Sequence, residues 1–259
     1  MKPMFSIVTV CRNSAAVLPN ALASLRAQSC TDREWVVVDG GSNDGTFEMV
    51  LASAEPLGTC ISEPDSGIYD AMNKGWRRAS GDIVYFLNSD DMLFDANVLA
   101  RVAAAFAREP ATELLVGEVI YQYPDQLQKR RSFRHIDSNS LVFGDLCHQS
   151  VFVRRALFER IGGFDQRFTI NADYDWLIRA FRSGARVQWL DLPVARFTTG
   201  GLHRRNFAKL VAERRVVRLQ YVSPFQLWLG LMRSRTTDRV NMLLGRGRAG
   251  QLPLAMGEQ

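Results

Sequence analysis

Strand-like apolar runs and helix-like segments alternate along the first two-thirds of the chain. A strand buried on both faces is an almost unbroken run of apolar residues, whereas a helix repeats its apolar positions every three to four residues. The strand-like segments are 5–10, 35–38, 59–62, 83–87, 114–121 and 186–190. The helix-like segments are 15–28, 46–54, 68–79, 98–106 and 174–181. Residues 132–163 follow neither pattern, so we expect them to be irregular.

This order of elements predicts an α/β fold with a mostly parallel central sheet and helices on both of its faces. Right-handed crossover connections then bring the carboxyl ends of the strands to one edge of the sheet. Polar loops follow four of these ends, at 11–13, 39–42, 63–65 and 89–91. Because ligands of such folds bind along that edge, we expect a binding site there.

Two adjacent carboxylates, Asp90 and Asp91, follow closely after the strongly apolar run 83–87. Neighbouring carboxylates repel each other, and burying one is costly unless a cation compensates its charge. A hard divalent cation is the usual partner of such oxygen ligands. The pair therefore predicts a metal site for a phosphorylated ligand, but it could equally cap the next helix, over 96–108.

The loop after the strand at 35–38 is rich in glycine and aspartate over residues 39–46. Its glycines allow tight turns and the close approach of a ligand. It has neither the GxGxxG pattern of dinucleotide sites nor the GxxxxGK[ST] pattern of a P-loop. We interpret Asp39 as an acceptor for a ribose hydroxyl or a base N–H, and Asp44 as the cap of the next helix.

A dense polar segment spans residues 63–75. Within it, Asp70, Asn73 and Lys74 are spaced i, i+3 and i+4, so we expect them on one face of a helix. Lys74 could offer its charge to a phosphate. The spacing fits slightly better an ordinary ion pair on a solvated helix face.

Two further positions are candidates for catalysis. Asp173 stands near the start of a predicted helix, where it could cap the helix or act as a general base toward an acceptor hydroxyl. Asp175 is close by and could face elsewhere. A lone histidine such as His148 is more often structural than catalytic, and no second His or Cys stands near it at ligand spacing, so we expect no transition-metal site.

Composition narrows the class of protein. Hydrophobic residues make up 47% of the chain and charged residues 23%, as in an ordinary globular protein. The four cysteines form no CxxC pair, which argues against a zinc site or a disulfide scaffold and suits a reducing compartment.

The first apolar run is too short for a signal peptide, and no window holds the roughly 18 apolar residues of a membrane span. We therefore expect a cytoplasmic protein that is neither secreted nor integral to a membrane.

The positive charge gathers in a basic tail. Residues 204–248 hold eleven Lys or Arg and two acidic residues, a net +9, so the remainder carries −4 of the total of +5. Apolar residues interleave with these arginines, which predicts contact with an anionic membrane surface. A helical hairpin packed on the rest of the chain is an equal alternative. We expect no nucleic-acid partner, because no nucleic-acid-binding module accompanies the charge.

The order of these motifs resembles glycosyltransferase family 2 enzymes with a GT-A fold, over roughly residues 4–203. The motifs that carry the resemblance are 6–10, 38–46, 63–75, 87–91, 148–150 and 172–175. The resemblance implies a catalytic domain over 1–203, followed by a basic helical extension over 204–259. The absence of a QxxRW motif indicates a non-processive enzyme that transfers one sugar.

The resemblance also implies how the donor is bound. Asp39 would hold the base or the ribose, and Thr9 and Arg12 would line the nucleotide pocket. Asp65 and Lys74 would approach the base or the diphosphate.

The remaining matched positions imply the chemistry. Asp91 would bind Mn²⁺ or Mg²⁺ at the diphosphate, with Asp90 beside it on the ribose or the sugar. Asp173 would remove the proton of an acceptor hydroxyl as that hydroxyl attacks the anomeric carbon with inversion. His148 would face the diphosphate or the acceptor. The family often has Glu directly before the base, whereas this chain has Ala there, so Asp175 stays an alternative base.

The implied function is transfer from a nucleotide-sugar, expected to be a UDP-sugar, to a saccharide or lipid-linked acceptor in cell-surface polysaccharide biosynthesis. The basic tail would place the enzyme on the inner face of the membrane. One alternative is a sugar nucleotidyltransferase, which usually needs a glycine-rich basic loop that residues 11–14 lack. The other is a non-catalytic, membrane-associated nucleotide-binding module, against which the intact carboxylates Asp90, Asp91 and Asp173 argue.

Overall fold

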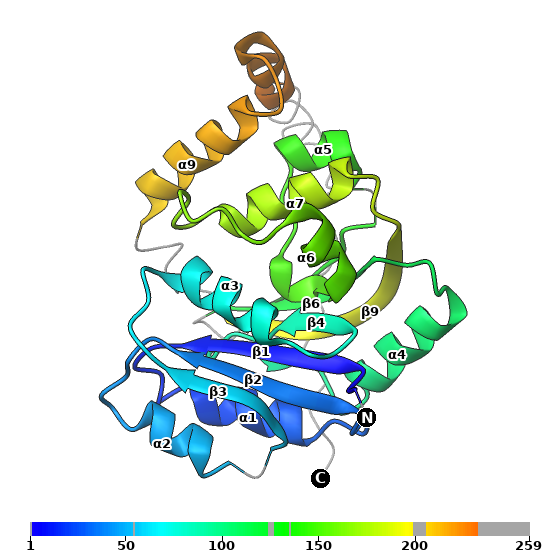
Figure 1. Ribbon diagram of the computed structural model, residues 1–259. Coiled ribbons are helices and arrows are strands. Elements are labelled where there is room, and N and C mark those ends of the chain that lie inside the picture. Colours follow the sequence, from blue (N-terminus) through cyan, green and yellow to red (C-terminus); the bar gives the residue numbers. More distant parts are fainter. Residues whose placement is uncertain (1, 54, 124–126, 135, 199–205, 233–259) are drawn as a thin grey trace.

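A computed structural model describes residues 2–53, 55–123, 127–134, 136–198 and 206–232 (Figure 1). Within these residues a nine-stranded sheet has the order β3-β2-β1-β4-β8-β6-β9-β5, with β7 paired to β6. Helices cover both faces of this sheet, as the sequence predicted.

The first half of the sheet is parallel and carries the polar loops. It consists of β3 (Leu57–Ser62), β2 (Arg33–Asp39), β1 (Phe5–Cys11) and β4 (Ile83–Phe86). Every residue of β1 and β4 is buried, because these strands have neighbours on both edges and helices on both faces. These strands therefore form a rigid base for the loops at their carboxyl ends.

The strand order changes direction between β1 and β4, and in open α/β sheets such a change marks a crevice at the carboxyl ends of the strands. The chain runs outward from β1 to β2 and β3, then returns through α3 (Ile68–Arg78) to β4 on the other side of β1. At this point the loops after β1 and β4 touch, with the Ser89 hydroxyl donating to the Ser14 hydroxyl over 3.1 Å. Ligands of open α/β sheets bind at such a switch point.

The core lies in two layers, one on each face of the sheet. One layer holds α1 (Leu18–Arg26), α2 (Thr46–Leu51) and α4 (Val98–Arg108). The other holds α3 together with the later helices of the chain. Aromatic side chains are packed together in this second layer. The Phe158 ring stacks on Trp176, with ring centroids 4.3 Å apart, and on Trp76, with centroids 5.2 Å apart.

The second half of the sheet is mixed in direction. In it, β8 (Val151–Arg154) runs antiparallel between β4 and β6 (Leu114–Gln122), and β9 (Val187–Thr198) is parallel to β6. The remaining strands are β5 (Met92–Leu93) and β7 (Gln128–Arg131).

The prediction that residues 132–163 are irregular was wrong. They contain α5 (Ser138–Phe143), the 3₁₀ turn η1 (His148–Ser150), β8 and α6 (Arg155–Ile161). Each of these elements is at most seven residues long, too short to show a clear periodicity in the sequence. The helix that follows, α7 (Ala172–Arg182), was predicted by its spacing.

Asp70 and Lys74 pair over 3.3 Å on α3, as their spacing predicted, whereas Asn73 of the same set is not on a solvated surface. Asn73 is buried and turns to the loop before α7, where its amide donates to the Phe164 carbonyl over 2.8 Å and accepts from the Phe164 N–H over 2.9 Å. A helix has 3.6 residues per turn, so positions i+3 and i+4 lie to the left and to the right of position i. Asn73 can therefore face the interior of the protein while Lys74 lies nearer to solvent.

The described part of the basic tail packs on the rest of the chain. It comprises α9 (Phe207–Leu219) and a second helical segment at 224–232. Val217 is fully buried, and the Tyr221 hydroxyl donates to Asp175 over 2.7 Å. The predicted domain boundary at 203–204 and the tail beyond 232 lie outside the described residues. No helix in the described part of the chain is both long and apolar enough to cross a membrane.

Candidate active site

Asp39 is the last residue of β2 and lies at the edge of the sheet where the carboxyl ends of the parallel strands gather. Its carboxylate is fully buried and accepts hydrogen bonds from the Ser42 backbone N–H over 2.9 Å, from the Ser62 hydroxyl over 2.5 Å and from the Ser42 hydroxyl. Burial alone would raise the pKa of Asp39, but these hydrogen bonds outweigh it and hold the pKa below its usual value. Asp39 is therefore an ionised acceptor at the floor of the crevice.

Arg12 and Asp65 meet above Gly40, the residue after Asp39. A side chain at Gly40 would clash with the Asp65 carboxylate and would come within 3.3 Å of the Arg12 Cδ. The loops after β1, β2 and β3 thus converge because a glycine allows their close approach. Asp65 also accepts from the Gly67 N–H over 2.9 Å, which fixes the turn into α3.

Thr9 does not lie in this crevice, contrary to the prediction that it lines the nucleotide pocket. It is fully buried, and its hydroxyl accepts from the Trp35 indole N–H over 2.9 Å. The alternation of side chains along β1 turns Thr9 toward the core layer of α1.

Lys74 and Asp44 have the structural contacts that the sequence suggested. Lys74 pairs with Glu63 over 3.0 Å and with Asp70 over 3.3 Å, beside the loop after β3. Asp44 accepts from the backbone N–H of Thr46 at the start of α2 and from that of Ala15. A phosphate contact of Lys74 stays a prediction.

Asp91 is nearly fully buried beyond the end of β4, whereas its neighbour Asp90 is exposed. One Asp91 oxygen accepts from the Gln149 amide over 2.9 Å, and the other has no hydrogen-bond partner among the described residues. Burial and the charge of Asp90 raise the pKa of Asp91 to about 7. A buried carboxylate with an unpaired oxygen is a position where a cation is expected.

The alternative that this pair caps the next helix was wrong. The N-cap of α4 is Asn97, and Asp95 accepts from the Asn97 N–H over 2.8 Å. Asp90 and Asp91 are therefore available for another role.

Asp173 is held between a tyrosine and a histidine. The Tyr69 hydroxyl of α3 lies 2.7 Å from one Asp173 oxygen, and His148 Nδ1 lies 3.0 Å from the other. His148 Nε2 lies 3.3 Å from the Asn88 amide nitrogen, after β4. This series of contacts connects the end of β4 to the first turn of α7.

The charges around His148 favour its protonated form. Burial would lower the pKa of His148, but the hydrogen bond and charge of Asp173, together with the charges of Asp91 and Asp90, outweigh it and raise the pKa. For Tyr69, burial and the charge of Asp173 act in the same direction. Both raise its pKa, so this hydroxyl keeps its proton.

Asp175 lies on the opposite side of α7 in a structural ion pair. It is buried, accepting from Arg179 over 2.9 Å and from the Tyr221 hydroxyl over 2.7 Å. Both of its oxygens are thus engaged by α7 and the tail.

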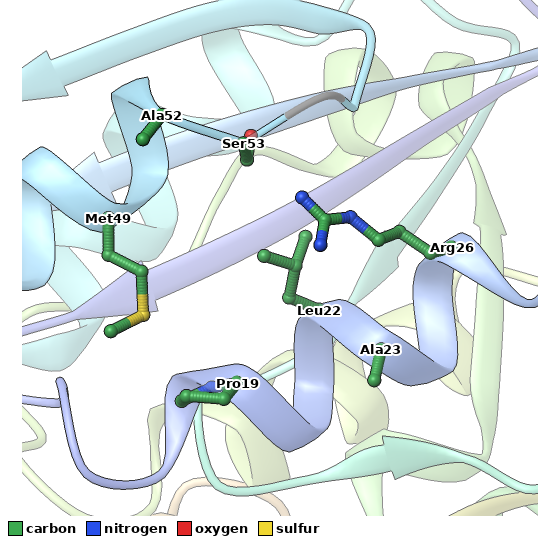
Figure 2. Close-up of a pocket in the computed structure, with 7 residues that line it drawn as sticks. All are labelled: Pro19, Leu22, Ala23, Arg26, Met49, Ala52 and Ser53. Carbon is green, nitrogen blue, oxygen red and sulfur yellow. The ribbon is translucent and has the colours of Figure 1, made fainter.

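Residue-level reasoning from the sequence missed Tyr69, Asn88 and Gln149 as parts of this cluster. All three stand inside motifs that the sequence singled out. Their place in these motifs was the one sign in the sequence that they could belong to the site. A shallow hollow between α1 and α2 contains none of the predicted site residues (Figure 2). It is lined by Pro19, Leu22, Ala23, Arg26, Met49, Ala52 and Ser53.

Relatives named as glycosyltransferases and solved structures of similar fold match this chain. A PGL/p-HBAD biosynthesis glycosyltransferase of Mycobacterium bovis is 40% identical over 209 residues, which cover 77% of this chain and 79% of that protein. The fragment 1–349 of TarS of S. aureus, solved with UDP-GlcNAc, is 20% identical with a TM-score of 0.66, covering 94% of this chain and 73% of the fragment. The mannosyltransferase PcManGT of Pyrobaculum calidifontis, solved with GDP-Man and Mn²⁺, is 18% identical with a TM-score of 0.59, covering 95% and 79%.

The structural likeness confirms the predicted α/β fold of GT-A type. The family model for glycosyl transferase family 2 matches residues 6–204, which include every residue that the sequence predicted for the site. The chain therefore belongs to glycosyl transferase family 2.

Proposed function

We propose that this protein transfers a single sugar from a nucleoside-diphosphate sugar, in the first instance a UDP-sugar, to a hydroxyl of a saccharide or lipid-linked acceptor, with inversion. The observation that carries the proposal is the Asp173 carboxylate. It is held by Tyr69 and His148 and connected through Asn88 to the strand end that bears Asp90 and Asp91.

The donor would bind at the crevice between β1 and β4. Asp39 is an ionised acceptor on its floor, suited to a base N–H or a ribose hydroxyl, and Arg12 offers a positive charge at its rim. The structurally similar TarS and PcManGT bind UDP-GlcNAc and GDP-Man, which supports a nucleotide-sugar donor. The curated relative is named for biosynthesis of PGL/p-HBAD, which supports a role in biosynthesis of a cell-surface glycan.

The residues at the end of β4 fit a divalent metal. No group of three or more His, Cys, Asp or Glu within the described residues could enclose an ion. Mg²⁺ and Mn²⁺ in phosphate-binding enzymes are often held by one or two carboxylates together with substrate phosphates. Asp91, through its unpaired buried oxygen, would hold the ion with Asp90 beside it. When bound, the ion offsets the charge that develops on the leaving diphosphate.

Asp173 would act as the general base. It removes the proton of the acceptor hydroxyl, whose oxygen forms the new bond to the anomeric carbon while the bond from that carbon to the diphosphate oxygen breaks. Tyr69 and His148 orient the two Asp173 oxygens, and orientation of this kind supplies a large part of the rate of such displacements. Asp175 is less suited to this role, because its side chain is almost fully buried and its charge is paired with Arg179.

The tail would bring the enzyme to a membrane surface. The charged residues Glu213, Arg214 and Arg218 of α9 contact the rest of the chain. Large apolar side chains of the tail face solvent instead, an arrangement opposite to that of an ordinary surface helix. This exposed apolar set consists of Phe207, Val211, Val216, Leu219, Phe225, Trp228 and Met232. Exposed Lys209 and Arg215 accompany it, which suits an anionic lipid surface.

The test is release of the nucleoside diphosphate from a panel of UDP-sugars and GDP-mannose, with saccharide acceptors, in Mn²⁺ or EDTA. We expect Asp173→Asn to lower the transfer rate about 10²- to 10⁴-fold while nucleotide binding is kept. Asp91→Asn should lower the activity that depends on Mn²⁺. The matched control Asp175→Asn should melt earlier but keep the transfer rate within about threefold. Absence of release from every donor, or full activity of Asp173→Asn, would contradict the proposal.

A further inference from the structure

The helix α9 contacts the segment that leads into α7, although α9 lies beyond the region matched by the family model. Glu213 of α9 accepts hydrogen bonds from three consecutive backbone N–H groups, those of Thr169, Ile170 and Asn171. The distances to its Oε2 are 3.1 Å, 2.9 Å and 3.3 Å. The Thr169 hydroxyl adds a fourth bond, 2.7 Å to Oε1.

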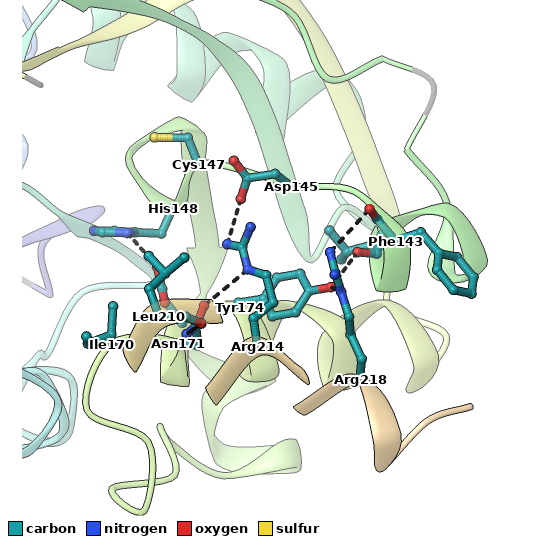
Figure 3. A network of polar contacts seen from close by, with 12 residues as sticks. Phe143, Asp145, Cys147, His148, Ile170, Asn171, Tyr174, Leu210, Arg214 and Arg218 are labelled. Carbon is teal, nitrogen blue, oxygen red and sulfur yellow. Dashed lines mark hydrogen bonds and ion pairs between the residues drawn. The ribbon is translucent and has the colours of Figure 1, made fainter. Parts of the chain in front are cut away.

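These contacts fix the segment 169–171, which leads into α7. Asn171 stands at the N-cap position of α7, but its side chain makes no capping hydrogen bond. Its amide instead donates to the Leu210 carbonyl of α9 over 3.0 Å and accepts from Arg214 over 3.2 Å. Figure 3 shows Arg214 between Asn171 and Asp145, with which it pairs at 3.1 Å. Through Glu213, Leu210 and Arg214, α9 thus holds the N-cap residue of α7 and the two residues before it.

The same segment is hydrogen bonded to the group that holds Asp173. Ile170 donates its N–H to Glu213, and its carbonyl oxygen lies 2.8 Å from the Tyr69 hydroxyl. Tyr69 in turn lies 2.7 Å from Asp173. Glu213 is thus connected to the Asp173 carboxylate through the backbone of Ile170 and the side chain of Tyr69.

The single proton of Tyr69 has two acceptors, the Ile170 carbonyl and the Asp173 carboxylate. When Asp173 is ionised, the hydroxyl can donate to it. When Asp173 has taken up a proton, Asp173 can donate to Tyr69, and Tyr69 can donate to Ile170 instead. The position of the Ile170 carbonyl therefore matters in both protonation states of Asp173.

We propose that Glu213 is a positioning residue for the sugar transfer, which fixes the segment 169–171 and through Tyr69 the orientation of Asp173. The inference rests on the proposed function, in which Asp173 is the general base. According to this proposal, α9 contributes to the geometry of the active site. A misplacement of about 1 Å at a reacting group can cost about 10²-fold in rate.

The experiment compares Glu213→Ala and Glu213→Gln with wild type in the full chain, with UDP-sugar, Mn²⁺ and a saccharide acceptor. We expect Glu213→Ala to lower kcat about 10- to 100-fold, while the KM for the donor and the binding of UDP stay within about twofold. Glu213→Gln should recover part of the loss, because its amide oxygen can still accept from the backbone N–H groups. Ala212→Ser, an exposed neighbour on α9, is the matched control and should keep wild-type kcat.

Two outcomes would overturn the inference. One is wild-type kcat in both Glu213 variants. The other is a parallel loss of UDP binding and kcat, which would indicate a purely structural role for Glu213. Failure of the wild-type protein to transfer from any donor would instead refute the proposed function and is visible in the same assay.

Discussion

At the scale of single residues, the same side-chain type has different roles because of its surroundings. Asp39, Asp91 and Asp175 are all buried, yet hydrogen bonds keep Asp39 ionised, an unpaired oxygen distinguishes Asp91, and an arginine pairs with Asp175. Asp173 is partly open and bonded to His148 and Tyr69. These differences in partners and burial are consistent with the proposal that Asp173 meets the acceptor.

The His148–Asp173 pair should make stability depend on pH. Because the folded-state pKa of His148 lies above its usual 6.5, protonated His148 stabilises the fold fully below pH 6.5. This contribution is lost as the pH rises through the folded-state pKa, and each unit of difference is worth about 1.4 kcal/mol.

We therefore expect His148→Gln to cost more unfolding free energy at pH 6 than at pH 9. The measurement is urea unfolding of both proteins in EDTA across that range, without nucleotide. A difference that is constant, or that grows with pH, would show that the neighbouring carboxylates do not stabilise the imidazolium.

At the scale of elements, α3 is the helix on which the site depends. Gly75 lets it approach β1 so closely that a methyl group there would clash with Val8. On another side, Asn73 bonds both backbone groups of Phe164. The helix is thus fixed between the sheet and the loop before α7, which sets the position of its Tyr69 relative to Asp173.

Gly75→Ala should destabilise the protein by up to about 2 kcal/mol. Alanine favours a helix over glycine by about 1 kcal/mol, but overpacking against a stiff, buried valine costs about 1–3 kcal/mol. Urea unfolding gives the value, with Arg78→Ala on the exposed side of α3 as the control, expected to stay within about 0.5 kcal/mol. Equal or greater stability of Gly75→Ala would mean that α3 shifts at little cost.

At the scale of the whole molecule, the tail forms one end of the fold and packs on α7, next to the group that holds Asp173. The parallel strands bring the polar loops to the crevice, whereas α9 and the segment 224–232 lie beyond α7 (Figure 1). The exposed apolar set belongs to this end, where the Phe225 and Trp228 rings stack with centroids 6.3 Å apart. An enzyme with this layout could meet a membrane through its tail while its donor crevice stays open to water.

Replacing Phe225 and Trp228 together by Ser should weaken binding to anionic phosphatidylglycerol vesicles by on the order of tenfold, since each ring loses apolar burial worth about 1 kcal/mol or more. Co-sedimentation measures the binding. Leu51→Ser is the matched control, since Leu51 is comparably exposed, 55% against 66% for Phe225 and 55% for Trp228, but lies on α2. Equal binding of the double variant and wild type, or no vesicle binding by wild type, would refute the membrane surface.

Much of the first half of the fold was predictable because its signals are local. The buried strands β1, β2 and β4 are runs of apolar residues, and the carboxylates Asp39, Asp65 and Asp91 follow strand ends in the sequence itself. The short β8 was not predictable, because four residues carry no distinctive period and its place between β4 and β6 depends on distant pairing.

The sequence by itself determined the family, the order of the motifs and the edge of the sheet where they gather, because periodicity and strand-end position are properties of neighbouring residues. Only the tertiary structure decided where each side chain points. It placed Thr9 in the core and Asp175 in an ion pair, and it brought Tyr69, His148 and Asp173 into contact although they are separated by 25 to 104 positions. It also placed Glu213 at the start of α7, because packing between helices far apart in the sequence depends on the whole fold rather than on local pattern.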